Sequence, residues 1–232
     1  MAIVLAAGIG KRFAGETGKL FYEIKGKPVI CYSLEAFDKC SFIDNIIVTY
    51  PFGQKEIYAE YFKNIKGISK NLLLVEGGAE RGNSVLNALE SGTEFNPEYV
   101  FIHDGARPLV TSEIIKRCYE EVKIKNAVIP GYPLEDTIKE VNRDNKIEFT
   151  PERSKYFCVQ TPQTFKFDLI YNSYKKHCQK LDKFTDDGSL LEKDGIPVFI
   201  VKGSKRNLKI TTIDDISLVE IYFEKEKVKR WK

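Results

Sequence analysis

Glycines and cationic side chains follow the first apolar run of the chain. The segment is Leu5-Ala6-Ala7-Gly8-Ile9-Gly10-Lys11-Arg12, with Lys19 a short distance beyond it. Small residues let backbone N–H groups approach a phosphate, and the cations neutralise its charge. The glycine spacing fits neither G-x-G-x-x-G nor G-x-x-x-x-G-K-[ST]. The segment therefore indicates either a nucleotide loop or a tight strand-to-helix turn followed by solvated charges.

A carboxylate stands at the end of a later apolar run. His103-Asp104-Gly105-Ala106-Arg107-Pro108 follows directly after Tyr99–Ile102. Ligands of open α/β sheets bind outside the carboxyl ends of the strands. Mg²⁺ takes one or two carboxylates together with phosphate oxygens, so Asp104 is a candidate magnesium ligand and Arg107 a candidate phosphate clamp. The alternative is a structural Asp–Arg pair in a turn.

A third glycine turn precedes a helical pattern. It is Glu76-Gly77-Gly78-Ala79-Glu80-Arg81-Gly82-Asn83-Ser84. Gly78 permits close backbone approach and the Ser84 hydroxyl suits a base or ribose, although a capped helix start explains the same residues. The sequence has no G-x-S-x-G or H-E-x-x-H pattern. Cations near glycine turns with one aspartate are typical of phosphate transfer by positioning and charge neutralisation.

Alternating strands and helices are predicted to position these residues. Apolar runs typical of strands buried on both faces are Ile3–Ala7, Ile46–Tyr50, Leu72–Val75, Tyr99–His103, Ala127–Pro130 and Val198–Val201. Helical spacing occurs in Val29–Lys39, Lys55–Lys66, Arg81–Glu94, Ser112–Lys123, Asp168–Lys180 and Asp214–Lys227. This order predicts an α/β fold with a mostly parallel sheet flanked by helices, in a single domain spanning residues 1–232.

One segment interrupts the alternation. Between Pro133 and Pro151 the residues are polar and only weakly alternating, with Asp144-Asn145 as a turn. We therefore expect a hairpin inserted at about residues 131–159. A hairpin of this length buries little by itself, so it should pack on another chain or lie over the site.

Composition narrows the class of partner. The 232 residues hold 36 Lys+Arg and 33 Asp+Glu, a net charge of +3, which is too weak to indicate nucleic acid but suits a small polyanionic substrate. Five widely spaced cysteines indicate free thiols in a reducing compartment. No signal peptide or run of 18 apolar residues is present, so we expect a cytoplasmic protein without a membrane partner.

The motifs together resemble a known family. In order they are Leu5-Ala6-Ala7-Gly8-x-Gly10-x-Arg12, Lys19, Gly77-Gly78-x-x-Arg81-x-x-Ser84, His103-Asp104-x-Ala106-Arg107-Pro108, Asp136-Thr137-x-Lys139, Arg153, Gln160-Thr161-Pro162-Gln163, Thr185-Asp186 and Asn207-x-Lys209. Over essentially its whole length the chain resembles the 2-C-methyl-D-erythritol 4-phosphate cytidylyltransferases of the non-mevalonate isoprenoid pathway. The first motif is shared by many sugar nucleotidyltransferases, whereas the ordered combination is specific to this family and its close relatives.

The resemblance implies a Rossmann-like nucleotidyltransferase fold and a protruding β-arm through which two subunits form a homodimer. It also implies a reaction. The phosphate of 2-C-methyl-D-erythritol 4-phosphate attacks the α-phosphorus of CTP in line, with Mg²⁺, giving 4-diphosphocytidyl-2-C-methyl-D-erythritol and pyrophosphate. A phosphate monoester, with a second pKa of about 6, is already a nucleophile near neutral pH, so no general base is needed.

The resemblance also implies residue roles. The catalytic residues would be Arg12, Lys19, Arg153 and Lys209. The CTP and Mg²⁺ site would comprise Ala6, Ala7, Gly8, Gly78, Ser84 and Asp104, with Asp104 as the metal ligand. The methylerythritol phosphate site would comprise Gly105, Arg107, Thr137, Arg153, Thr185 and Lys209. Thr137 and Arg153 lie in the arm and would serve the partner subunit's active site.

Two alternatives stand beside this hypothesis. Ribitol-5-phosphate cytidylyltransferases share the CTP site, although Ala7 and the Asp136–Lys139 motif favour methylerythritol. A catalytically inactive, dimeric nucleotide-binding protein is the second alternative, because Gly18-Lys19-Leu20 replaces the Pro-Lys-Gln usual in the family. Retention of Arg12, Asp104, Arg153 and Lys209 argues against it.

Overall fold

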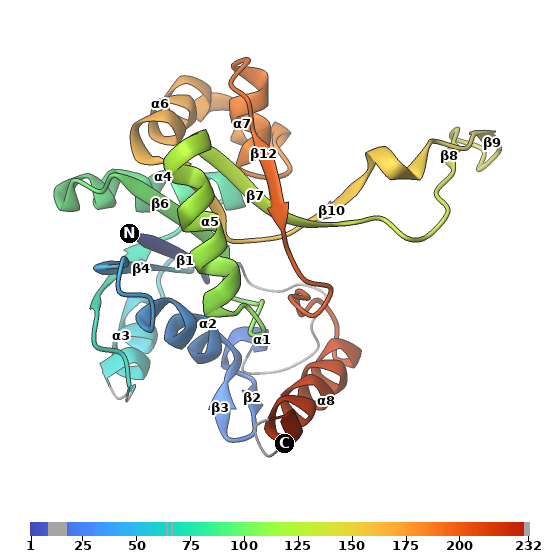
Figure 1. Cartoon of the computed structure of the whole chain (residues 1–232). Helices are drawn as coiled ribbons and strands as arrows, with labels where there is room; N and C mark the ends of the chain where they lie inside the picture. The colour runs from blue at the N-terminus through green and yellow to red at the C-terminus, as the bar shows by residue number, and fades with distance from the viewer. Residues whose placement is uncertain (9–17, 64, 66, 230–232) are drawn as a thin grey trace.

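The computed structural model describes residues 1–8, 18–63, 65 and 67–229 (Figure 1). Within them, eight strands form the main sheet. From one edge the order is β5 (Asn71–Glu76), β4 (Asn45–Tyr50), β1 (Ala2–Leu5), β6 (Tyr99–Asp104), β11 (Gln163–Lys166), β7 (Ala127–Pro133) and β10 (Phe157–Val159), and β12 (Phe199–Lys202) pairs with the other side of β7.

The strands around β1 are parallel. β1 pairs in parallel with β4 and β6, and β4 pairs in parallel with β5. This parallel core, flanked by helices, confirms the predicted fold class. The sequence analysis did not anticipate β11, which runs antiparallel between β6 and β7 and makes the sheet mixed.

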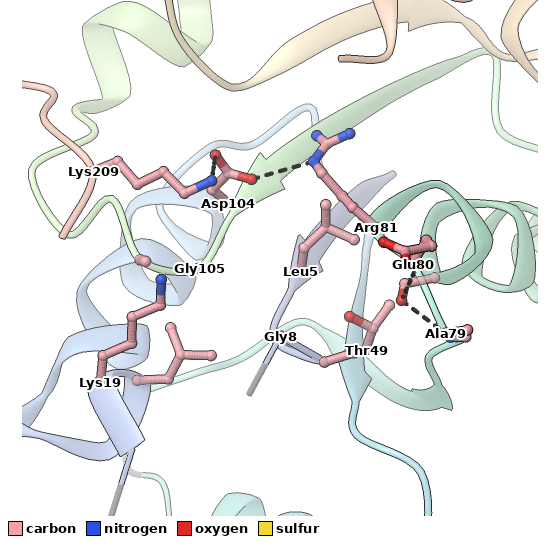
Figure 2. Close-up of a pocket in the computed structure, with 15 residues that line it drawn as sticks. Leu5, Gly8, Lys19, Thr49, Ala79, Glu80, Arg81, Asp104, Gly105 and Lys209 are labelled. Atoms are coloured by element: carbon pink, nitrogen blue, oxygen red, sulfur yellow. Dashed lines mark hydrogen bonds and ion pairs between the residues drawn. The ribbon is translucent and has the colours of Figure 1, made fainter. Parts of the chain in front are cut away.

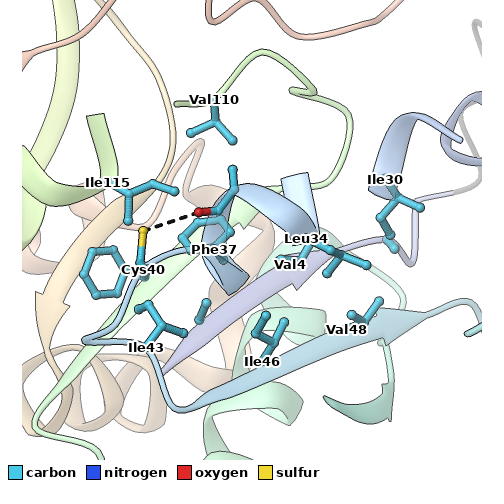
Figure 3. Close-up of a cluster of buried hydrophobic side chains, with 14 of the residues drawn as sticks. Val4, Ile30, Leu34, Phe37, Cys40, Ile43, Ile46, Val48, Val110 and Ile115 are labelled. Atoms are coloured by element: carbon cyan, nitrogen blue, oxygen red, sulfur yellow. Dashed lines mark hydrogen bonds between the residues drawn. The ribbon is translucent and has the colours of Figure 1, made fainter. Parts of the chain in front are cut away.

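Helices cover both faces of the sheet. One face carries α2 (Val29–Asp38), α3 (Lys55–Lys63) and α5 (Ser112–Lys125), and the other carries α4 (Arg81–Gly92), α6 (Phe167–His177) and α7 (Gly188–Lys193). The alternation of β1 explains the two cores, because Val4 packs on the α2 side and Ile3 on the α4 side. Figure 3 shows the first core, where Phe37 and Leu34 lie over Val4.

The remaining elements lie around this body. A third apolar cluster joins α8 (Asp214–Lys229) to the hairpin of β2 (Glu23–Ile24) and β3 (Lys27–Pro28). The other short elements are α1 (Gly18–Phe21), β8 (Glu140–Val141), β9 (Ile147–Phe149) and the 3₁₀ turns Thr93–Phe95, Arg153–Lys155 and Cys178–Lys183. Among the described residues, no helix combines the length and apolarity needed to cross a membrane.

Local chemistry sets the helix ends, as α5 illustrates. The Thr111 side chain accepts a hydrogen bond from the Ile114 N–H, Glu113 lies in the first turn, and Lys123 and Lys125 lie in the last. These charges oppose the partial charges at the helix ends. Asn126, with a φ of 65°, ends the helix in the left-handed region. α5 is thereby fixed against β7 and β11.

The segment between β7 and β10 extends away from the body (Figure 1). β7 and β10 pair at its base, and β8 and β9 form a small antiparallel ladder at its far end, around Asn145 with a φ of 61°. The accessible surface of the chain is 13328 Å². A compact monomer of 26.6 kDa exposes about 10,700 Å², so this chain has an unusually extended surface.

Candidate active site

A pocket opens at the carboxyl ends of β1, β4 and β6, where open α/β sheets place their ligands (Figure 2). Its volume is about 290 Å³. The lining residues come from six parts of the chain and are Leu5, Ala7, Gly8, Lys19, Leu20, Thr49, Gly78, Ala79, Glu80, Arg81, Ser84, Asp104, Gly105, Ala106 and Lys209. Segments separated by up to 200 residues in sequence therefore meet in one cavity.

Many of the predicted site residues lie in this wall. They are Ala7, Gly8, Lys19, Gly78, Ser84, Asp104, Gly105 and Lys209. Ala6 lies just behind it, where its N–H donates to Thr49 and its carbonyl accepts from the Tyr58 hydroxyl. Both backbone groups of Ala6 are thus already engaged within the protein.

Three cations surround the Asp104 carboxylate at the end of β6. Lys209 Nζ lies 3.0 Å from Oδ2, Arg107 Nε lies 3.5 Å from Oδ2, and Arg81 Nε lies 3.6 Å from Oδ1. Figure 2 shows Lys209 and Arg81 reaching Asp104 from opposite sides. Burial alone would raise the pKa of Asp104, but the charges of Arg81, Lys209 and Arg107 outweigh it and hold the pKa well below the ordinary value. Asp104 is therefore an anion at neutral pH.

His103 and Thr161 fix the backbone on which Asp104 sits. The Thr161 hydroxyl accepts a hydrogen bond from the Asp104 N–H at 3.1 Å and lies 2.9 Å from His103 Nδ1. Burial lowers the pKa of His103 to about 3, so its ring is neutral. His103 is therefore a strand-end hydrogen-bonding residue.

Arg81 links the pocket to a fully buried carboxylate, which sequence analysis did not reveal. Its guanidinium donates in bidentate geometry to the two Asp187 oxygens, each at 2.7 Å, and Asp187 is 0% exposed. The Tyr174 hydroxyl donates to the same carboxylate at 2.5 Å. Arg81 thus lies between Asp104 and Asp187, and the second anion holds it in place.

The glycine turn before α4 is shaped by contact with the segment that follows β1. A Cβ atom on Gly77 would lie 2.3 Å from the Ala7 Cβ, so no larger residue fits there. The Ser84 hydroxyl accepts from the Gly78 N–H at 3.1 Å and donates to the Glu80 carbonyl at 3.2 Å. Ser84 therefore holds the turn while also lining the pocket.

Lys19 and Lys209 lie on the same side of the pocket (Figure 2). Lys19 Nζ donates to the Ile210 carbonyl at 3.3 Å, so α1 contacts the segment that carries Lys209. Gly18 has a φ of +68°, a left-handed conformation that proline cannot adopt. Proline, which is usual in the family at this position, therefore could not replace Gly18 in this conformation.

Arg107 lies behind the pocket wall. Its guanidinium donates to the Asn207 carbonyl at 2.8 Å as well as pairing with Asp104. Arg107 therefore ties the segment before Lys209 to the end of β6.

The structure leaves several other predicted residues away from the pocket of this chain. Thr137 and Arg153 are exposed in the extended segment, where Arg153 donates to the Glu135 carbonyl at 2.7 Å. Thr185 is exposed just before α7 and is not among the lining residues. Arg12 lies outside the described residues.

The side chains that line the pocket indicate what kind of metal ion it could hold. In the described parts of the chain, no three His, Cys, Asp or Glu side chains are placed to hold a metal. Two acidic residues line the cavity: Asp104, which lies among cations, and Glu80, whose side chain accepts a hydrogen bond from the Asn83 N–H at the start of α4. This suits Mg²⁺ that takes most of its ligands from substrate phosphates and water, and it does not suit a metal held by protein alone.

The sequence matches the family model described as "IspD: 2-C-methyl-D-erythritol 4-phosphate cytidylyltransferase" over residues 1–225. The chain belongs to the IspD family. A cytidylyltransferase of this name from Caldicellulosiruptor bescii is 42% identical over 224 residues, covering 97% of each chain. Another, from Dictyoglomus thermophilum, is 42% identical over 225 residues, covering 95% of this chain and 94% of the relative.

Solved structures agree with this assignment. The 4-diphosphocytidyl-2C-methyl-D-erythritol synthase of Anaerococcus prevotii has a TM-score of 0.83 and 30% identity, covering 96% of this chain and 97% of that one. The IspD of Francisella tularensis has a TM-score of 0.76 and 30% identity, covering 94% and 97%. The protein is accordingly a nucleotidyltransferase of the non-mevalonate isoprenoid pathway, as the sequence predicted.

Proposed function

We propose that this pocket joins CTP to 2-C-methyl-D-erythritol 4-phosphate. An oxygen of the methylerythritol phosphate forms a bond to the α-phosphorus of CTP, and the bond from that phosphorus to the oxygen bridging the β-phosphate breaks. Pyrophosphate leaves with the electron pair. The observation that supports this most is the convergence of Asp104, Lys19 and Lys209 on one cavity beside the Gly78 turn.

Charge explains why this arrangement suits the reaction. Two phosphate-bearing substrates repel one another, and fixed cations offset that repulsion without reorganising during the step. We assign the triphosphate to Lys19 and Arg12, and the methylerythritol phosphate to Lys209 and Arg153. The backbone of Ala7, Gly8 and the Gly78 turn would border the cytidine, because small residues let a ligand approach the backbone closely.

We assign a magnesium ion to Asp104. The ion would be held by this carboxylate and by triphosphate oxygens, and it would neutralise negative charge on the triphosphate. Lys209 Nζ lies 3.0 Å from Asp104 Oδ2, so the lysine that we assign to the methylerythritol phosphate is next to the proposed metal ligand.

We further propose that the segment at about residues 131–159 is an arm that forms a homodimer. Apolar side chains on it are open to solvent, including Ile147 at 56%, Phe149 at 49% and Phe157 at 44%. Exposed apolar surface of this kind marks an interaction site. A second copy would bring Thr137 and Arg153 to the neighbouring pocket, where they would contact the methylerythritol phosphate.

Pyrophosphate release tests the reaction. With CTP and Mg²⁺ present, we expect turnover with 2-C-methyl-D-erythritol 4-phosphate and little with ribitol 5-phosphate. Turnover only with ribitol 5-phosphate would contradict the proposal. Turnover with neither, despite CTP binding, would favour the inactive nucleotide-binding alternative.

Subunit mixing tests the shared site. Arg153→Ala and Lys19→Ala subunits should each be inactive as homodimers, whereas mixed dimers should contain one site with both residues intact. We expect activity to reappear after subunit exchange. No recovery despite exchange proven by mass spectrometry would place Arg153 in the site of its own chain or outside any site.

A further inference from the structure

We propose that Gln160 is a positioning residue for Lys209, joining the base of the arm to the loop that carries this lysine. The proposal rests on the assigned role of Lys209 in binding the methylerythritol phosphate. Gln160 stands in the Gln160-Thr161-Pro162-Gln163 motif, between β10 and β11. It lies outside the pocket wall and acts only through the loop.

The loop from Gly203 to Lys209 has no regular secondary structure, so other parts of the protein must fix it. The Gln160 amide supplies three hydrogen bonds. Its Nε2 donates to the Ser204 carbonyl at 2.8 Å and to the Asn207 carbonyl at 2.9 Å, and its Oε1 accepts from the Ser204 N–H at 3.2 Å. One side chain therefore closes the loop across four residues, ending two residues before Lys209.

The close packing of this contact leaves no room for adjustment. Gln160 is 3% exposed, so its amide has no access to bulk water in exchange for these bonds. A Cβ atom on Gly203 would lie 2.6 Å from Gln160 Oε1 and 3.0 Å from the Gly131 nitrogen. Glycine at this position is what lets the loop approach the amide.

The same region is anchored to the arm. The Gln160 N–H donates to the Pro130 carbonyl at 2.7 Å, which continues the pairing of β10 with β7 at the base of the arm. An ion pair between Lys205 in the loop and Glu135 in the arm adds a second connection. Displacement of the arm base would thus be transmitted to the Lys209 backbone.

Two substitutions test this through different atoms. Gln160→Met keeps the length of the side chain and removes the amide, and Gly203→Ala keeps the amide and pushes the loop away from it. For each we expect KM for methylerythritol phosphate to rise about tenfold, equivalent to about 1.4 kcal/mol. KM for CTP should change less than twofold, because the Gly78 turn is untouched.

Ser173→Ala is the matched control. Ser173 is a buried residue of α6 whose hydroxyl donates to Asp194 at 2.6 Å. Its loss should lower the melting temperature without changing either KM. An equal rise in KM for Ser173→Ala would reduce the Gln160 effect to general destabilisation and overturn the proposal.

A double-mutant cycle adds a second readout. In a Lys209→Ala background, Gln160→Met should change kcat/KM less than twofold, because the group it positions is already gone. Full additivity of the two substitutions would overturn the proposal.

Hydrogen exchange tests the contact without reference to activity. Amides in residues 203–210 should exchange at least about fivefold faster in Gln160→Met than in the wild type, while those of β1 and β4 should not change. Unchanged exchange in the loop would overturn the proposal. Since this readout needs no substrate, it decides the role of Gln160 in the loop even if the enzyme proves to use another polyol phosphate.

Discussion

The pocket and the arm differ in which side chains are buried. At the pocket and directly behind it, Asp104 and Asp187 are buried carboxylates, Arg81 between them is partly buried, and each has an opposite charge in the same chain. In the arm, Ile147 and Phe149 are apolar yet exposed, and no element of the described chain covers them. Buried charges are tolerated when paired, and apolar surface is stabilised when covered. The charges at the pocket are thus neutralised within the chain, whereas the apolar side chains of the arm need a partner chain to cover them.

Removing one charge of the Arg81–Asp187 pair should destabilise the fold. Asp187→Ala leaves the partly buried Arg81 guanidinium without its bidentate partner, so the free energy of unfolding should fall by about 3 kcal/mol, near the lower limit for a broken buried pair because Arg81 is 32% exposed. Urea denaturation measures the change. Asp182→Ala, an exposed aspartate in the neighbouring 3₁₀ turn, should cost less than about 0.5 kcal/mol. A loss below about 1 kcal/mol for Asp187→Ala would show that the pair does not stabilise the fold.

Adding a charge to the arm should weaken the proposed dimer. Phe149→Lys places an ammonium group in the proposed interface, so the dimer dissociation constant should rise about tenfold to hundredfold, matching the 1.5–3 kcal/mol of a buried phenylalanine. Analytical ultracentrifugation measures it. Phe52→Lys is the control, because Phe52 is 87% exposed on the body of the molecule. If both variants dissociate equally, the arm is not the interface.

A backbone change at the pocket mouth should have a smaller effect. Gly18→Pro restores the residue usual in the family, but the φ of +68° excludes proline, so α1 and Lys19 should shift. We expect kcat/KM to fall about tenfold, equal to about 1.4 kcal/mol. Gly18→Ala, which strains the same φ but keeps the N–H, should cost less. Higher activity in Gly18→Pro would mean that the φ seen here is not the active conformation.

A carboxylate away from both regions should have the smallest effect. Asp194 lies near Lys176, His177 and Ser173, and although burial raises its pKa, these hydrogen bonds outweigh it and lower the pKa below the ordinary 3.8. The unfolded chain therefore binds the proton first as the pH falls, so this stabilisation is present above pH 3.8 and is lost below it. Asp194→Asn should lower the melting temperature slightly at pH 7, and the difference should vanish towards pH 2. A difference that grows at low pH would contradict this assignment.

Most strands and helices and the place of Asp104 could be predicted, because they depend on the spacing of residues close together in the sequence. Buried strands and amphipathic helices followed from apolar periodicity, and Asp104 was placed at the pocket because a carboxyl strand end is recognisable in sequence. β11 was missed because its four residues, Gln163–Lys166, are too few for an alternating pattern to stand out.

Contacts between side chains that are far apart in the sequence could not be predicted. Arg81 and Asp187 are separated by 106 positions, and nothing in either local segment indicates that the two meet. Gln160 was recognised only as part of a motif, since the carbonyls it binds belong to a loop about 45 residues later. Side-chain partners across a fold become visible only when the topology brings the segments together.

The place of β1 between β4 and β6 also has a consequence for folding during synthesis. β1 leaves the ribosome first, but β6 begins only at Tyr99, and at 5–20 residues per second the wait is about 5 to 20 seconds. Lys209 follows more than a hundred residues after Asp104. The nascent chain thus contains the four parallel strands β5, β4, β1 and β6 more than a hundred residues before Lys209 is added, so the ligand site can be completed only late in synthesis.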